Sequence, residues 1–202
     1  MHSFNEKSKQ RWGHKMAKVI QEADYIKKRK LKYFTRTAIS LSIMLGIFIL
    51  GLILTKTRNN IFTLVAILFT LVVAQNGVQY ISIIPFKDGS REVAKQLESL
   101  PHAYIVWNSA LFGDSKGMTS IDHVLISDQH IYCILDKEHK NTSKNIETMK
   151  RIAKQKGLKD KVIFIQGAKG ELNQLLKRLE NKEVRDSESQ EVFVEALKTA
   201  AI

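Results

Sequence analysis

Two uncharged apolar runs, residues 37–55 and 61–84, follow one another in this 202-residue chain, with a five-residue loop between them. About 20 helical residues cross a hydrocarbon core of about 30 Å, so each run predicts a transmembrane helix. Gln75, Asn76 and Gln79 interrupt the second run, which spans a bilayer if these amides face the first helix or lie near the lipid interface. The alternative is a soluble hairpin buried in a core, but the rest of the chain offers too little apolar surface to bury it.

The distribution of basic residues predicts how this hairpin is oriented. Residues 1–36 carry 11 Lys and Arg against three acids, whereas the loop at 56–60 carries two bases. Because basic residues near the ends of spans stay cytoplasmic, we expect a multi-pass protein of the cell membrane with both termini in the cytoplasm. We interpret residues 1–36 as a basic juxtamembrane arm, mostly helical from residue 5. The anionic inner leaflet would attract it by about 1 kcal/mol per Lys or Arg.

The formal net charge of +12 comes mainly from the arm and the loop, because residues 86–202 carry 19 bases and 17 acids. A DNA-binding domain usually carries its basic patch on the domain itself, so this balance fits a membrane surface better than nucleic acid. A local cluster of charge inside the domain stays open. The single cysteine, Cys133, excludes an internal disulfide, and its apolar neighbours indicate a buried strand thiol.

Pro85 ends the hairpin, and residues 86–182 predict a small α/β domain. Apolar periodicity predicts strands at 103–107, 119–127, 130–135 and 161–166, and helices at 91–100, 141–157 and 171–179. Residues 183–202 predict a charged C-terminal tail with a short helix. The expected fold class is a two-helix transmembrane hairpin at 37–84 followed by a cytoplasmic α/β domain, in which helices flank a mixed sheet.

One stretch of the domain carries a recognisable motif. The triplet Ile121-Asp122-His123 opens an apolar strand, a short turn follows, and the next strand, HIYCIL, leads into Asp136-Lys137. Together with the preceding segment GSREVAKQLESL, residues 89–137 resemble the nuclease-related domain (NERD) family. The resemblance implies a restriction-endonuclease-like fold and a bacterial membrane protein.

The resemblance implies a nuclease that hydrolyses phosphodiester bonds with the help of Mg²⁺. In such a site an Asp and a Glu hold the Mg²⁺, and a Lys two residues after the Glu orients the attacking water. Asp122 matches the metal-binding Asp, and Lys137 matches the Lys. The position of the Glu is occupied by Leu135. We therefore expect a catalytically degenerate site with no cofactor, in which Asp122 and Lys137 are vestigial catalytic candidates and Asp122 binds Mg²⁺ only if the site is active.

The function expected from this degenerate site is that of a membrane-anchored binding or scaffold module. The first alternative is a Mg²⁺-dependent, membrane-tethered nuclease acting on nucleic acid, in which Asp136 or Glu138 replaces the missing Glu. Strand alternation places both on the face opposite residue 135, so a one-residue bulge would be needed to bring Asp136 into the site. Alternation also predicts that His123 faces away from Asp122.

The second alternative is an accessory subunit of a membrane complex. In that case Gln75, Asn76 and Gln79 would pair with the helices of a membrane-protein partner, because amides hydrogen-bond across helices in a bilayer. Metal and nuclease assays separate the first two functions, and copurification of a partner separates the third.

Overall fold

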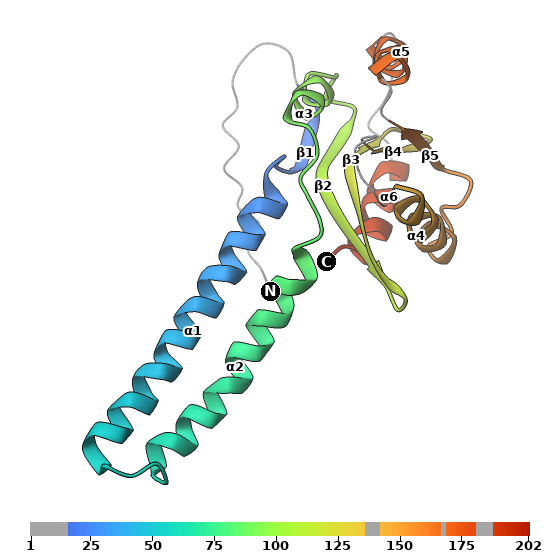
Figure 1. Ribbon diagram of the computed structural model, residues 1–202. Helices are drawn as coiled ribbons and strands as arrows, with labels where there is room; N and C mark the ends of the chain where they lie inside the picture. The colour runs from blue at the N-terminus through green and yellow to red at the C-terminus, as the bar shows by residue number, and fades with distance from the viewer. Residues whose placement is uncertain (1–15, 136–141, 167–168, 181–187) are drawn as a thin grey trace.

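The structure is a computed structural model that describes residues 16–135, 142–166, 169–180 and 188–202. Two long antiparallel helices, α1 (Tyr25–Thr55) and α2 (Ile61–Ile83), form a hairpin that projects from an α/β body (Figure 1). Among the described residues, these two helices are long and apolar enough to cross a membrane. The prediction of two consecutive apolar helices is confirmed, and α1 also includes residues 25–36 of the arm, which were expected to be helical.

A tight turn joins the two helices. Lys56 adopts the left-handed conformation (φ 51°) and ends α1, while the side chain of Asn60 accepts a hydrogen bond of 2.9 Å from the backbone N–H of Thr63 and caps α2. A Cβ atom added to Gly51 would lie 2.5 Å from Cβ of Phe62, so the helices approach most closely where glycine leaves room.

The three amides of α2 behave differently from one another. Asn76 donates a hydrogen bond of 3.4 Å to Oγ of Ser40 on α1, as expected for an amide that faces the first helix. Gln75 and Gln79 are exposed on the outer surface of α2. Of the two arrangements expected for these amides, facing α1 or lying near the lipid interface, the first is observed for Asn76 and not for Gln75 and Gln79.

The described residues form a five-stranded mixed sheet in the order β1-β2-β3-β4-β5. Its strands are β1 (Lys18–Gln21), β2 (Ile105–Asp114), β3 (Gly117–Ile126), β4 (Ile131–Leu135) and β5 (Val162–Gln166). The two outer pairs, β1–β2 and β4–β5, are parallel, and the central strands are antiparallel. The predicted mixed sheet is confirmed, with one strand more than expected.

That extra strand corrects the prediction for the N-terminal arm. Residues 5–36 were expected to be mostly helical, but Lys18 to Gln21 form β1, which pairs in parallel with β2. Trp107 contributes to this contact, since its indole N–H donates a hydrogen bond of 3.0 Å to Oε1 of Gln21. Residues 1–15 lie outside the described residues.

Helices cover both faces of the sheet, as Figure 1 shows. They are α3 (Arg91–Glu98), α4 (Thr142–Gln155), α5 (Lys169–Glu180) and α6 (Glu188–Lys198). One apolar cluster lies between the sheet and α4 and α6, with Met149, Ile152 and Leu197 in it, and is called the α4–α6 core here. The α3–α5 core, on the opposite face, contains Leu97 and Leu176. Side-chain burial on both faces explains why the central strands are apolar almost throughout.

The predicted buried thiol is confirmed. Cys133 lies in β4 within the α4–α6 core and is fully buried. Burial raises the pKa of the Cys133 thiol to about 12, because the apolar surroundings disfavour the thiolate. This cysteine is therefore unreactive in the folded protein.

Candidate functional site

The alternation of β2 and β3 breaks at one row of the sheet. Ile121 and Val124 both lie in the α4–α6 core although they are three residues apart, and so do Trp107 and Ala110 on the neighbouring strand. Strict alternation would place the members of each pair on opposite faces. Ser109, inside the second pair, has φ 49°, which is uncommon for a residue other than glycine. Both strands therefore turn an additional residue toward the α3 side.

This break brings the Asp122-His123 pair onto one side. A Cβ atom built on Gly89 would lie 3.0 Å from Cβ of Asp122 and 2.7 Å from Nε2 of His123. Gly89, two residues before the start of α3, thus lies against both side chains, and Asp122 and His123 are only 2% and 1% exposed. The prediction that His123 faces away from Asp122 is wrong, because it assumed uninterrupted alternation.

A polar relay fixes the imidazole of His123. The side-chain amide of Asn108 donates a hydrogen bond of 2.8 Å to Oε1 of Glu98 at the end of α3. The side-chain oxygen of Asn108 then lies 2.8 Å from Nδ1 of His123 and accepts a hydrogen bond from it. The imidazole is held with its second nitrogen, Nε2, toward Gly89. Sequence reasoning missed Asn108 and Glu98, although a polar Asn inside the apolar segment IVWNSALF was a usable signal.

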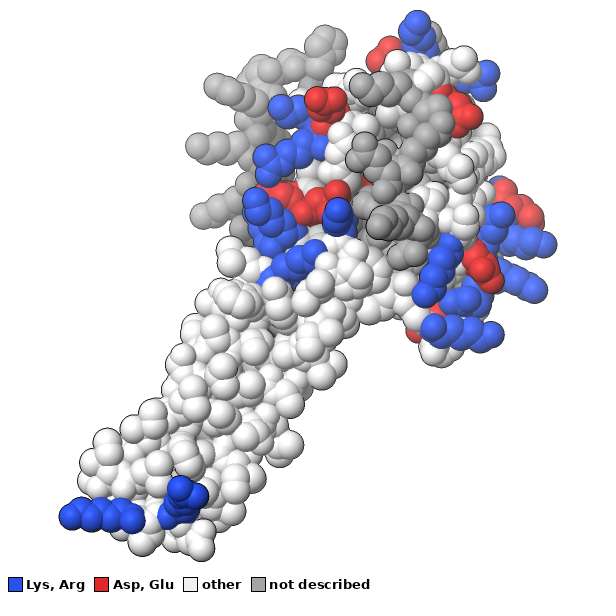
Figure 2. Space-filling model, in the orientation of Figure 1, with Lys and Arg blue, Asp and Glu red and all other residues white. Residues whose placement is uncertain are grey.

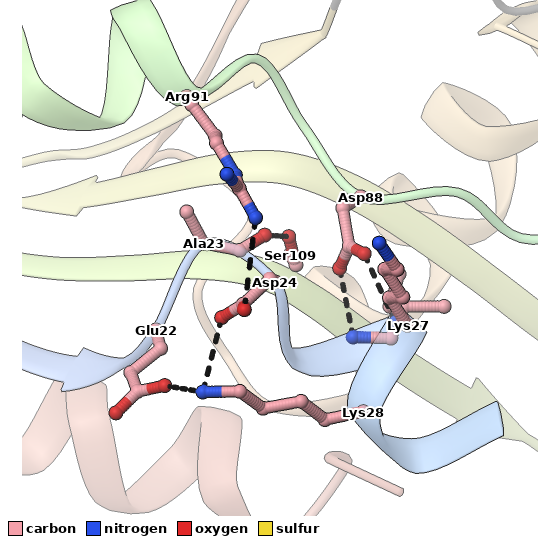
Figure 3. A network of polar contacts seen from close by, with 9 residues as sticks. Glu22, Ala23, Asp24, Lys27, Lys28, Asp88, Arg91 and Ser109 are labelled. Carbon is pink, nitrogen blue, oxygen red and sulfur yellow. Dashed lines mark hydrogen bonds and ion pairs between the residues drawn. The ribbon is translucent and has the colours of Figure 1, made fainter. Parts of the chain in front are cut away.

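Ser109 joins three separate segments beside this pair. Its hydroxyl donates a hydrogen bond of 2.7 Å to the carbonyl of Ala23 and accepts one of 3.3 Å from the N–H of Gly89. Its own carbonyl accepts 2.9 Å from the side chain of Gln21. The turn before α1 and the loop after α2 therefore meet at β2, the strand next to the one that carries Asp122 (Figure 3).

The same loop holds the hairpin. Both carboxylate oxygens of Asp88 accept backbone hydrogen bonds from the first turn of α1, 2.7 Å from Ile26 and 2.9 Å from Lys27 (Figure 3). A carboxylate is favoured at a helix N-terminus, where backbone N–H groups have no partner within the helix. The ammonium group of Lys30 donates to the carbonyls of Ile84 and Phe86, at 2.7 and 2.6 Å, and so ends α2.

Leu135 occupies the position where the resemblance implies a Glu. β4 pairs residue for residue with β3 from Ile131 to Ile134, and with β5 from Ile131 to Leu135. Leu135 is fully buried in the α4–α6 core, whereas Asp122 lies against Gly89. Of the other predicted site residues, Lys137 and the alternatives Asp136 and Glu138 lie outside the described residues.

The described residues do not fit a Mg²⁺ site. This cation takes an octahedral shell of oxygen ligands, usually with one or two carboxylates. Within the described residues, no three His, Cys, Asp or Glu side chains are grouped so that they could hold a metal ion. The carboxylate of Asp122 is nearly inaccessible under the loop that carries Gly89. No metal-dependent step can be derived from this arrangement.

A second polar contact ties α4 to the β2–β3 hairpin. Arg151 donates to both carboxylate oxygens of Asp114, at 3.0 Å from Nη2 and with a shorter contact from Nε. The hydrogen bond from Arg151 lowers the pKa of Asp114 to about 2, and the backbone N–H groups of Lys116 and Gly117 add to the effect. The β2–β3 turn is thereby fixed against α4.

Comparison with known families identifies most of this body. A family model described as the nuclease-related domain matches residues 87–196, more than half of the chain, from the loop between α2 and α3 into α6. The strand β1 and the helical hairpin lie outside this match. Searches of curated proteins and of solved structures found no match.

Proposed function

This chain belongs to the nuclease-related domain family, and on that premise we propose that it is a membrane-anchored bacterial member whose nuclease-like site is catalytically degenerate. Its domain would then act as a binding or scaffold module at the cytoplasmic face. The observation that carries this proposal is Leu135, a fully buried aliphatic residue at the position of the expected Glu.

The surroundings of Leu135 support a true loss of the carboxylate rather than a shifted register. Regular pairing of β4 with β3 up to Ile134, and with β5 up to Leu135, fixes which residue occupies each row of this strand. Packing in the α4–α6 core beside Cys133 accounts for a leucine there, since a buried Leu side chain stabilises the fold by about 2 kcal/mol. Of the Asp and Glu expected to bind the metal ion, the described residues contain only Asp122.

The surface of the hairpin supports membrane anchoring. Its apolar side chains point outward along both helices, as at Ile43, Ile49, Ile53, Leu64, Ile67 and Leu71. Exposure of such a large apolar surface to water is unfavourable, whereas contact with lipid tails removes this cost. In Figure 2 the visible shaft is uncharged, with Lys and Arg side chains at its two ends. The basic residues near the start of α1 favour both termini in the cytoplasm.

Metal binding tests the degenerate site. Calorimetric titration of the purified full chain in detergent with Mg²⁺ and Mn²⁺ should give the same weak heat for the wild type and for Asp122→Asn. A saturable site that disappears in Asp122→Asn would overturn the proposal and favour the Mg²⁺-dependent nuclease.

Thiol labelling in intact cells tests the orientation. Because Cys133 is buried, single cysteines introduced at exposed positions report alone. Arg58→Cys in the loop should react with a membrane-impermeant maleimide from outside, and Lys95→Cys on α3 should react only after lysis. The reverse pattern would place the domain outside the cell.

A role as an accessory subunit of a membrane complex is a second candidate, favoured by Gln75 and Gln79. Both glutamines are exposed one helical turn apart on the outer surface of α2. Amides in a bilayer stabilise helix association by about 1 kcal/mol through hydrogen bonds. Replacing both with Leu should abolish cross-linking to a partner helix if this candidate is correct, and an unchanged cross-linking pattern would exclude these glutamines as the contact.

A further inference from the structure

Positive charge in the α/β body is concentrated in one segment. Residues 142–166, from α4 to β5, carry seven Lys and Arg and two acids. The whole of 86–202 carries 19 bases and 17 acids, so the rest of the body is net acidic. The local cluster that composition left open therefore exists, and it lies on α4 and the strand that follows it.

Four of the seven bases line a groove of about 470 Å³ between α4 and β5, namely Lys150, Arg151, Lys154 and Lys159. Lys150, Lys154 and Lys159 are exposed at its rim, and Val162 and Phe164 contribute apolar surface. The ammonium group of Lys150 lies 5.7 Å from the centre of the Phe164 ring. We call this feature the α4 basic groove.

The charges around the groove differ in availability. Arg151, which also lines it, is bound to the carboxylate of Asp114, so most of its charge is already compensated. The three lysines at the rim belong to no ion pair among the described residues. They are available to an external anion.

The position of the groove relative to the hairpin points to the source of that anion. In Figure 1, the tip of the β2–β3 hairpin reaches down to about the level at which α2 ends, and α4 lies just above this tip, across the sheet from the shaft of α1 and α2. Figure 2 shows the Lys and Arg side chains over α4 near the level where the basic residues of the shaft begin. The ion pair between Asp114 and Arg151 holds α4 against the tip of the β2–β3 hairpin in this orientation.

We propose that the α4 basic groove rests on the headgroups of anionic lipids in the leaflet that the hairpin enters. This inference rests on the membrane anchoring in the proposed function and adds a second contact, made by the domain itself. Each Lys near an anionic surface strengthens association about fivefold, and the effect is confined to about 10 Å at ordinary salt. Because the hairpin tethers the domain, the lipid surface is present at high effective concentration.

Fluorescence quenching of the full chain in vesicles tests this contact. The chain with Lys156→Cys, at an exposed position just after α4, carries one fluorophore, because Cys133 is buried. Vesicles of phosphatidylcholine, with or without phosphatidylglycerol, contain lipids with a nitroxide on the headgroup. Quenching should rise severalfold when phosphatidylglycerol is present and fall again at high salt.

Charge variants identify the groove. Lys150→Gln with Lys154→Gln should weaken the docked state about 25-fold, at about fivefold per cation. Lys95→Gln, which removes an exposed lysine on α3 at the other face of the sheet, should leave quenching unchanged. Equal quenching in both vesicle types, or equal quenching in the double variant and the wild type, would overturn the proposal.

Three further outcomes are distinguished in the same preparation. Flotation of the vesicles tests anchoring separately: a chain that does not float removes the proposed function and this inference with it. A chain that floats but is not quenched removes this inference alone. If short duplex DNA, and not phosphatidylglycerol, changes the fluorescence through Lys150 and Lys154, the groove is a nucleic-acid surface and the lipid proposal is wrong.

Discussion

Asp88, in the loop after the second apolar helix, accepts a hydrogen bond of 2.7 Å from the backbone N–H of Ile26, in the first turn of the first helix. The next residue of the loop, Gly89, contacts both Asp122 and His123. One short segment therefore holds the base of the hairpin and covers the candidate site. A displacement of the helices at this end would be transmitted directly to the loop above Asp122.

Asp88→Ala should destabilise the protein, because it removes the cap of α1 and leaves two backbone donors without their partner. Loss of such a cap costs about 1 kcal/mol. A thiol-reactive dye in detergent measures the unfolding temperature, since Cys133 becomes reactive only on unfolding. The exposed carboxylate of Asp160 offers the control Asp160→Ala, and equal unfolding temperatures for the two variants would contradict the capping role.

Gly89→Ala should be destabilising by about 1–3 kcal/mol, as expected when a methyl group is forced into a filled space. The new Cβ would lie 2.8 Å from the carbonyl oxygen of Asp122, whose neighbours Ile121 and His123 are both paired with β2, so the strand has little freedom to shift. Gly170→Ala is the matched control, because a Cβ there has no neighbour within 4 Å. Denaturant unfolding of both variants checks the difference, and an equally stable Gly89→Ala would show that the loop does not press on Asp122.

Much of the fold follows from periodicity, because its signals are local. The apolar face of α4 and the alternation at the end of β3 predicted these elements to within a few residues. β1 escaped prediction because Lys18–Gln21 is a four-residue edge strand with few apolar residues, and its partner β2 lies more than 80 residues away. Only that long-range pairing makes the segment a strand.

The sequence motif named candidate residues for the site but did not give their geometry. The motif located Asp122 and showed Leu135 in place of Glu, and the structure adds that Leu135 is buried. The positive φ of Ser109 has no local sequence signal, because serine rarely adopts it and the contacts to Ala23 and Gly89 that accompany it are distant in sequence. Alternation alone therefore placed His123 on the wrong face.

Asp114→Asn should lower stability near neutral pH and lose this effect in acid. The folded-state pKa of Asp114 is about 2, below its ordinary value of 3.8, because Arg151 hydrogen-bonds to the carboxylate. The unfolded chain therefore binds the proton more readily, so the contribution is complete above about pH 4 and is lost as pH falls toward 2. Tryptophan fluorescence during urea unfolding should show the two proteins converging over that range; a constant difference would exclude this carboxylate as the titrating group.

Leu135→Glu should not restore an active site. Its side chain would lie in the α4–α6 core rather than against Gly89, where burial of an unpaired polar group costs several kcal/mol. Leu135→Ala, which creates only a cavity, should cost about 2–5 kcal/mol and serves as the size control. A Leu135→Glu variant that folds stably and cleaves DNA with Mg²⁺ would show that residue 135 belongs to the site.

The most direct test of catalytic degeneracy is a cleavage assay on the full chain in detergent, with plasmid and single-stranded DNA and with Mg²⁺ or Mn²⁺. Failure of Cys133 to react with the thiol dye shows that the sample is folded. The degenerate site predicts no cleavage above the protein-free background with either metal. Cleavage by the wild type that disappears in Asp122→Ala would contradict the account and identify the protein as a membrane-tethered nuclease.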